Sequence, residues 1–179
     1  MRGRSLAIAL LLLLSAAQVR AETSGLTQTG FTVTFTREVG ATPEKLWDAL
    51  LQIGNWWSSS HTWSGKASNM SLEPRANGCW CESWDGASVQ HGNVVWIQPN
   101  RVLRFYAGLG PLQDRAATGV LTFALAASKE NKDKTTLKLT YRVAGPADAG
   151  LQEVAPAVDK VMGEQVKRLA AYVETGKPE

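Results

Sequence analysis

The sequence predicts an α+β domain in which one antiparallel sheet is covered by a single long helix near the C-terminus. Residues 69–144 repeat a pattern of strand and tight turn with no helix in between. Parallel strands need long crossover connections, so this pattern indicates an antiparallel sheet. The only long helical periodicity that follows covers residues 152–175. The 158 residues that follow the first 21 suit one domain.

The domain is expected to open with a strand and one or two short helices. Apolar and threonine residues alternate over 31–39, as in a half-buried strand. The next stretch changes to helical spacing, with Thr42 as the N-cap and Pro43 at the first helical position. Gly54 ends or bends this helix, and residues 55–58 are predicted to form a short second one.

Six further strands bring the predicted sheet to seven. Tight turns such as Asp85-Gly86 separate them. In the last strand, Leu137 and Tyr141 point to one side and Lys138 and Arg142 to the other, so one face of the sheet is dry and one is wet. These strands are expected over 70–75, 79–84, 88–98, 101–109, 117–127 and 135–144.

The C-terminal helix is amphipathic, and its apolar stripe includes Met162 with Gln165 inside it. Pro156 is acceptable only near the beginning of this helix. A strongly twisted sheet that curls around the helix leaves space between the two. The sequence therefore predicts a cavity there.

The first 21 residues are typical of a secretory signal peptide. Arg2 and Arg4 precede an apolar run over 6–17, and Val19-Arg20-Ala21 suits cleavage after Ala21. The run is short for a membrane span, although a retained N-terminal anchor is the alternative. We expect an exported protein, periplasmic or secreted, with residues 22–29 as a flexible lead-in, a domain over 30–175 and no integral membrane span after cleavage.

Charge gives no reason to expect a nucleic-acid partner. The full chain carries a net charge of +3, and all three arginines of the signal segment leave with it. The mature chain is then neutral, which excludes an electrostatic case for binding nucleic acid or an anionic membrane surface.

The two cysteines, Cys79 and Cys81, lie on one predicted strand. Positions i and i+2 of a regular strand are about 6.5–7 Å apart, whereas a disulfide prefers Cα atoms about 5.5–6 Å apart. Two free thiols are therefore the expectation, and a strained, reducible bridge is the alternative. The cysteines and the two scattered histidines lack the spacing of a zinc site, so we expect no metal and no cofactor.

Five of the seven tryptophans lie within residues 55–86. Trp80 and Glu82 share one face of their strand, so Glu82 is a candidate carboxylate in an apolar cavity, where burial would raise its pKa and suit it to acid–base catalysis. The alternatives are that Glu82 faces water or pairs with an arginine such as Arg104. Of Trp56 and Trp57, one ring is expected in the core and one at the cavity mouth.

Other polar residues carry weaker predictions. Ser58–His61 has no Gly-x-Ser-x-Gly elbow and no acid placed to orient the ring, so nucleophilic catalysis is not expected there. His91 fits a hydrogen-bonded structural histidine. Gln165 either contacts a ligand or satisfies a buried backbone group, and the Tyr141 hydroxyl needs a partner.

The segments "ATPEKLWDALLQIGNWW", "NMSLEPRANGCWCESWDG", "HGNVVWIQPNRVLRF" and "TTLKLTYRV", with the final helix, resemble the START-like, or SRPBCC, superfamily. The resemblance spans about residues 31–175 and is nearest to the homologues of the activator of heat-shock protein 90 ATPase and to polyketide cyclase-like proteins. It implies the helix-grip fold of the birch-pollen allergen, with an apolar cavity for lipids, steroids or polyketides. Some members are enzymes and many only bind or carry.

Together these observations predict an exported carrier for a small hydrophobic molecule, with its protein partner unknown. The first alternative is a cyclase or hydro-lyase that uses Glu82 as general acid or base, helped by His91. The second is a protein-interaction module related to chaperone-ATPase activators. The residues expected to line the cavity are Trp57, Trp80, Glu82, Tyr141, Met162 and Gln165.

Overall fold

A computed structural model describes residues 20–179 as one antiparallel sheet with a long helix beside it. The sheet order is β1-β2-β8-β7-β6-β5-β4-β3, and every neighbouring pair is antiparallel. The strands are β1 (Arg20–Thr27), β2 (Gly30–Val39), β3 (Met70–Leu72), β4 (Cys79–Trp84), β5 (Ala87–Gln98), β6 (Val102–Ala107), β7 (Thr118–Ala127) and β8 (Thr135–Ala144). The helices are α1 (Pro43–Leu51), α2 (Ile53–Trp56) and α3 (Leu151–Thr175), and the 3-10 turns are η1 (Ser59–His61), η2 (Ala67–Asn69) and η3 (Gly110–Leu112).

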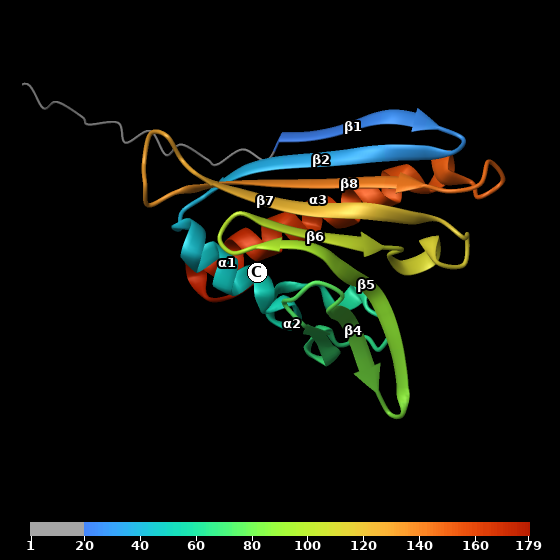
Figure 1. Cartoon of the computed structure of the whole chain (residues 1–179), viewed down its shortest axis with the longest axis horizontal. Coiled ribbons are helices and arrows are strands. Elements are labelled where there is room, and N and C mark those ends of the chain that lie inside the picture. Colours follow the sequence, from blue (N-terminus) through green and yellow to red (C-terminus); the bar gives the residue numbers. More distant parts are fainter. Residues whose placement is uncertain (1–19) are drawn as a thin grey trace, which may run out of the picture.

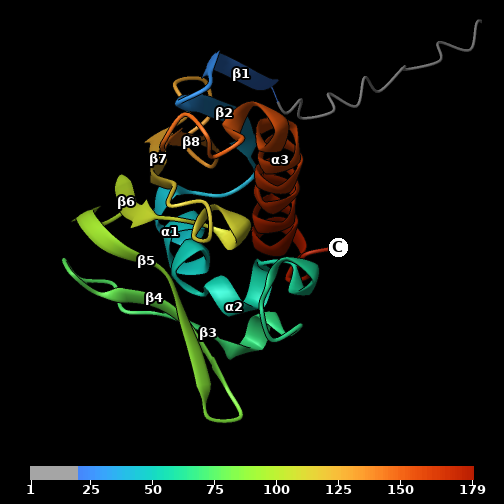
Figure 2. The same cartoon turned by 90° about the vertical axis from the view of Figure 1, so that its right-hand side faces the viewer.

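The predicted architecture of sheet and C-terminal helix is confirmed. Helix α3 runs along one face of the strands β2, β8 and β7, as Figures 1 and 2 show. At the other end of the sheet, the β4–β5 hairpin projects away from the body of the molecule, and α2, η1 and η2 lie between it and the end of α3. Helix α3 makes its main strand contacts with β2 and β1, at one edge of the sheet.

Residues 20–179 form eight strands, so the prediction of seven was wrong. The additional strand is β1, which pairs with β2 from Arg20↔Thr36 to Thr27↔Gly30 and covers most of the expected flexible lead-in. The described side chains of β1, from Glu22 onward, are exposed. A strand with no buried face shows no apolar alternation, and this is why the sequence pattern does not reveal it. Residues 1–19 of the predicted signal peptide lie outside the described residues.

The two short helices form as expected, although the second begins two residues earlier than predicted. Thr42 caps α1 by accepting a hydrogen bond from the Lys45 backbone N–H at 3.4 Å. Helix α1 ends at Leu51, and α2 follows from Ile53. A Cβ atom at Gly54 would lie 2.9 Å from the carbonyl oxygen of Ala67, so glycine lets α2 approach η2.

Helix α3 is held against the sheet by its apolar stripe. Leu151, Met162, Val166 and Leu169 are buried, and Pro156 lies in the second turn of the helix. Gly163 packs on β2, where an added Cβ atom would meet the ring of Phe35 at 2.9 Å. Within residues 20–179, no helix is long and apolar enough to cross a membrane.

Candidate functional site

A pocket of about 330 Å³ lies where α3 stands apart from the sheet. Residues of α3 form one wall, β5 and β8 contribute one side chain each, and the segments around η1 and η3 close the ends. The lining residues are Trp57, Ser60, His61, Thr62, Trp63, His91, Leu109, Gly110, Pro111, Leu112, Tyr141, Val154, Ala157, Val158, Val161 and Met162. The predicted cavity between sheet and helix is therefore present, and its wall is mainly apolar.

Of the six residues that the sequence placed in the lining, the structure brings Trp57, Tyr141 and Met162 to the pocket wall. The other three are Trp80, Glu82 and Gln165. They are each 0% exposed, and they pack behind the wall instead of lining it. Strand alternation correctly predicts that Trp80 and Glu82 point inward. It does not predict how far each side chain lies from the pocket, and other side chains stand between these two and the pocket.

Glu82 is a structural carboxylate that holds a loop to β4. Its Oε1 accepts a hydrogen bond from the Ser64 backbone N–H at 2.6 Å, and its Oε2 accepts one from the Trp63 N–H at 3.1 Å. The ring of His91 supplies a third donor to Oε2 at 2.9 Å. The prediction that Glu82 itself lines the cavity was therefore wrong. Pairing with Arg104 is also excluded, since Arg104 donates to Thr122 and covers the ring of Trp96.

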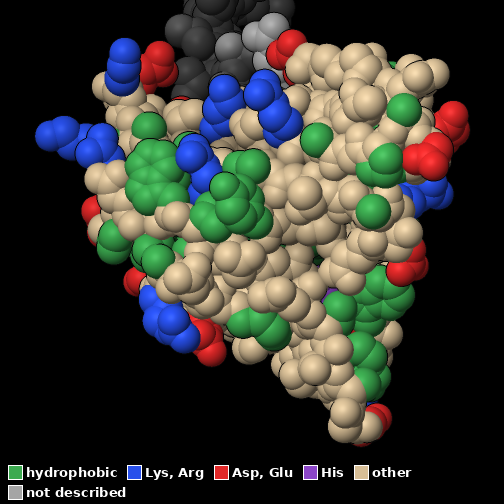
Figure 3. All heavy atoms as spheres, turned by 45° about the vertical axis from the view of Figure 1, so that its right-hand side comes forward, with side chains coloured by type: hydrophobic (Ala, Val, Ile, Leu, Met, Phe, Trp, Pro, Cys, Tyr) green, Lys and Arg blue, Asp and Glu red, His purple; other side chains and the backbone are tan. Residues whose placement is uncertain are grey.

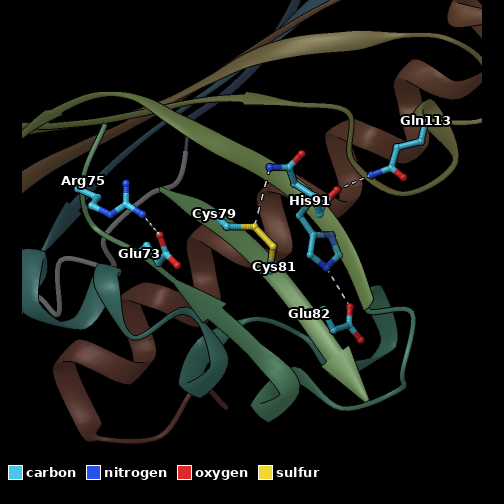
Figure 4. The surroundings of a disulfide bond; sticks show 8 residues. Glu73, Arg75, Cys79, Cys81, Glu82, His91 and Gln113 are labelled. Carbon is cyan, nitrogen blue, oxygen red and sulfur yellow. Dashed lines mark hydrogen bonds and ion pairs between the residues drawn. A yellow bond between two sulfur atoms is a disulfide. The ribbon is translucent and has the colours of Figure 1, made fainter. Parts of the chain in front are cut away.

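His91 connects this carboxylate to the pocket, because it is hydrogen-bonded to Glu82 and lines the pocket wall. It is 4% exposed, lines the pocket and points toward Glu82, as Figure 4 shows. Its ring packs at 5.3 Å, centroid to centroid, from the indole of Trp80, which in turn contacts Trp57 and Phe105. The aromatic cluster and the Glu82 hydrogen bond together fix the orientation of the imidazole.

A β-bulge gives His91 its position. Trp80 pairs with Gly92 and Cys81 pairs with Gln90, so His91 has no partner across β4. Its side chain and Gly92 are both buried, in contrast to the alternation of a regular strand. A Cβ atom at Gly92 would lie 2.6 Å from the Tyr106 carbonyl oxygen, so only glycine allows this close approach. A glycine inside a strand is the sequence signal that could have indicated the bulge.

The protonation states of the pair follow from their surroundings. Burial raises the pKa of Glu82, but hydrogen bonds from Ser64, Trp63 and His91 outweigh it, and the net pKa lies below the ordinary value. Burial lowers the pKa of His91, and Glu82 only partly opposes this. At neutral pH the pair is a carboxylate and a neutral imidazole. Because a carboxylate only accepts, the imidazole donates from Nε2, and Nδ1 carries a lone pair.

The side chains of Tyr141 and Gln165 form hydrogen bonds with backbone groups. The Tyr141 hydroxyl donates to the Ala107 carbonyl at 2.8 Å and accepts from the Leu109 N–H at 3.3 Å. Its burial raises the pKa of the phenol, so it stays protonated. Gln165 accepts from the Ser58 N–H at 2.9 Å through Oε1, while its buried Nε2 has no hydrogen-bond partner within the described residues.

The chain's other histidine stands at the pocket mouth. Nε2 of His61 lies 3.1 Å from Oε2 of Glu164 on α3, and both residues are partly exposed. The neighbouring Trp63 is 49% exposed, while both Trp56 and Trp57 are buried, so neither of these closes the mouth as predicted. Figure 3 shows a face on which hydrophobic and neutral surface predominates, with hydrophobic side chains along the projecting hairpin.

The cysteines form a disulfide, so the expectation of free thiols was wrong. Cys79 and Cys81 are bonded, with Cα atoms 5.4 Å apart, shorter than in a regular strand. The register shift that accommodates His91 falls between Trp80 and Cys81, and this irregularity accompanies the shortened spacing. The disulfide lies on the face of β4 opposite Trp80 and Glu82 (Figure 4). Among residues 20–179, no cluster of three or more His, Cys, Asp or Glu side chains suits a metal ion.

A sheet that grips a long helix around an apolar pocket defines the class of helix-grip ligand-binding proteins. Residues 30–174 match the family described as polyketide cyclase/dehydrase and lipid transport, and the chain belongs to this family of the SRPBCC superfamily. The superfamily expected from the sequence is thereby confirmed.

Solved structures agree in fold. A conserved protein of unknown function from Enterococcus faecalis is 15% identical, with a TM-score of 0.57 over 89% of this chain and 78% of that one. A Rhodobacter sphaeroides protein is 19% identical (TM-score 0.57; 87% and 99% covered). An Arthrobacter aurescens protein is 14% identical (TM-score 0.58; 83% and 89% covered). Among curated proteins, no sequence matches the chain.

Proposed function

We propose that this protein is an exported carrier that binds one small hydrophobic molecule in the pocket between α3 and the sheet. The observation that carries the proposal is the pocket itself, of about 330 Å³ with a mainly apolar wall. Its volume lies at the lower end of the range for small-molecule sites, about 300–1,000 Å³, and so favours one compact molecule. The family description, which includes lipid transport, agrees with binding and release.

Two features support export. The N-terminal segment has the pattern of a signal peptide, and the Cys79–Cys81 disulfide suits an oxidising compartment. Expression of the full chain in a bacterial host, followed by cell fractionation and N-terminal sequencing, tests this point. A periplasmic product that begins at Glu22 supports export, and a full-length product in the cytoplasm contradicts it.

Native mass spectrometry of the purified protein, before and after organic extraction, tests the carrier function. A bound compound should appear as a mass shift that extraction removes. Ala157, an exposed residue of α3 on the pocket wall, provides the blocking variant Ala157→Trp, which should lose most of the bound compound. Lys167→Trp, on an exposed part of the same helix away from the pocket, is the matched control. Equal loading of both variants would contradict the pocket as the binding site.

A second candidate function is acid–base catalysis on the bound molecule. Its support is the 2.9 Å hydrogen bond between Glu82 and His91, with the imidazole on the pocket wall. In this case His91 transfers the proton and Glu82 is a positioning residue. The compound recovered after incubation distinguishes the two functions, because a carrier returns it unchanged. An enzyme returns a product, and His91→Gln should then lower kcat by at least about a hundredfold.

A further inference from the structure

The pocket wall holds a side-chain nitrogen for which the described residues provide no hydrogen-bond partner. Nδ1 of His91 has no hydrogen-bond partner among residues 20–179, whereas Nε2 is fixed by Glu82. The other polar side chains on the described wall have partners or stand at the open mouth. Ser60 pairs with Ser58, Thr62 donates to the Ser59 carbonyl, and Tyr141 uses its hydroxyl twice. Trp57 donates its indole N–H to the His61 carbonyl.

Glu82 determines that Nδ1 of His91 accepts a hydrogen bond and does not donate one. Glu82 receives three N–H donors, and an ionised carboxylate has none to give. The proton of the neutral ring therefore stays on Nε2, and Nδ1 offers only a lone pair to the pocket. A ligand that fills the pocket must supply a donor at this point or leave a buried acceptor unpaired, which is costly.

The charges around the pocket restrict the kind of donor group that a ligand can carry. None of the residues that line the pocket is a lysine, arginine, aspartate or glutamate. An anionic ligand would enter an apolar space with no lysine or arginine on its wall and with the Glu82 carboxylate behind His91, at a large desolvation cost. An ammonium group would likewise find no carboxylate on the wall. A neutral donor on an apolar skeleton meets neither penalty.

We propose that the pocket selects apolar molecules that carry a neutral hydroxyl group, a phenol or an alcohol, which donates its hydrogen bond to Nδ1 of His91. This inference rests on the proposed carrier function and specifies the chemistry of its ligand. The apolar skeleton contacts the valines and Met162 of α3 and the rings of Trp57 and Tyr141. Glu82 contributes as a positioning residue, because it fixes which ring nitrogen faces the ligand.

The test compares three probes that share one skeleton: 2-naphthol, 2-methoxynaphthalene and 2-naphthoate. Their affinities for the extracted protein at pH 7.5 are measured by quenching of tryptophan fluorescence and by calorimetry. We expect 2-naphthol to bind about tenfold more tightly than its methyl ether, because only the hydroxyl satisfies Nδ1. We expect 2-naphthoate to bind more weakly than either. Equal affinity for the hydroxyl and ether probes in the natural protein would overturn the proposal.

Two variants locate the effect. His91→Phe keeps an aromatic ring but removes the acceptor, so the tenfold preference should fall to about one, while Tyr172→Phe, away from the pocket, should retain it. Glu82→Gln removes the ionised acceptor that holds the ring proton on Nε2, so the tenfold preference for the hydroxyl should weaken. A preference that survives in folded His91→Phe would also overturn the proposal.

The outcome also separates this inference from the function on which it rests. If none of the three probes binds and Ala157→Trp leaves the native mass unchanged, both the carrier function and the hydroxyl preference are wrong. If all three bind in competition with one another and lose affinity in Ala157→Trp, but without the expected order, the pocket is a binding site and only the hydroxyl preference is wrong.

Discussion

At the scale of single residues, the buried polar groups of this protein serve the fold first and the pocket second. Glu82, Gln165 and Tyr141 were all candidates for ligand contact, yet each is occupied by backbone N–H groups of the segments that close the pocket. Their contribution to binding is therefore indirect, because they hold the wall in place. His91 alone among the buried residues on the described wall keeps an atom free for a ligand.

The Tyr141 hydroxyl should be measurable as a structural group. In Tyr141→Phe, the Ala107 carbonyl and the Leu109 N–H lose their partner inside the protein, so the free energy of unfolding should fall by about 1–3 kcal/mol. Urea denaturation followed by tryptophan fluorescence measures this. Tyr172→Phe, whose hydroxyl bonds are exposed, should cost less than about 1 kcal/mol. An equal loss in the two variants would contradict this role.

The Glu82–His91 pair predicts how stability depends on pH. The unfolded chain takes up a proton at His91 near its ordinary pKa of about 6.5, whereas burial lowers the pKa of the folded imidazole. Stability is therefore lost as the pH falls below about 6.5. Glu82 acts in the same direction at lower pH, since its lowered pKa adds stability above the unfolded value of 4.5 that disappears on acidification.

Urea denaturation between pH 7.5 and pH 4 checks this dependence. The free energy of unfolding should decrease steadily with acidification, and His91→Gln should flatten the curve between about pH 6.5 and pH 5. The same series with His61→Gln shows how much of the slope belongs to the chain's other histidine. A curve for His91→Gln that is parallel to that of the natural protein would contradict the lowered pKa of His91.

At the scale of elements, alternation predicts which face of a strand is buried, and irregularities such as a bulge determine which side chains reach that face. The pattern of β4 correctly places Trp80 and Glu82 inward. The bulge in β5 adds one residue to one strand, so it shifts His91 to the inner face without any signal in the β4 sequence. The disulfide was missed for a related reason, because the expected Cα spacing assumed a regular strand.

The Cys79–Cys81 disulfide should contribute modestly to stability. It closes a loop of only three residues, so it removes little entropy from the unfolded chain, and it lies on the face opposite the aromatic cluster. The double variant Cys79→Ser, Cys81→Ser should lose at most about 2 kcal/mol in urea denaturation. Reductant should give a similar loss in the natural protein and none in the double variant. A loss above about 4 kcal/mol would show that the disulfide supports the Glu82 loop as well.

At the scale of the whole molecule, the fold class follows from the order of elements, and the position of the pocket does not. The predicted order of one strand, short helices, six strands and a long helix, to which the structure adds β1 at the start, restricts the topology strongly. The pocket opens at one end because the segments around Trp57–Trp63 and Leu109–Leu112 replace sheet contacts with α3. Those segments carry no periodic signal, so only their packing reveals that His61 and Trp63 reach the mouth.

The first strand provides a test at this scale. If residues 22–29 were a flexible lead-in, a chain that begins at Gly30 would be as stable as one that begins at Glu22. In the structure, β1 instead covers the backbone edge of β2, and Thr23 donates to Asp159 of α3 at 2.8 Å. The described side chains of β1 are exposed, so its contribution is mainly backbone hydrogen bonding, offset by the entropy of ordering the strand.

We therefore expect the chain from Gly30 to lose about 1–2 kcal/mol in urea denaturation, with little change in the denaturant slope because little apolar surface is involved. Hydrogen exchange should accelerate at those β2 amides that face β1, while the β7–β8 amides stay protected. An uncovered, regular β2 edge also invites pairing between chains, so the shortened protein should self-associate in sedimentation velocity. Equal stability and exchange in both chains would show that the segment is the loose lead-in that its composition suggests.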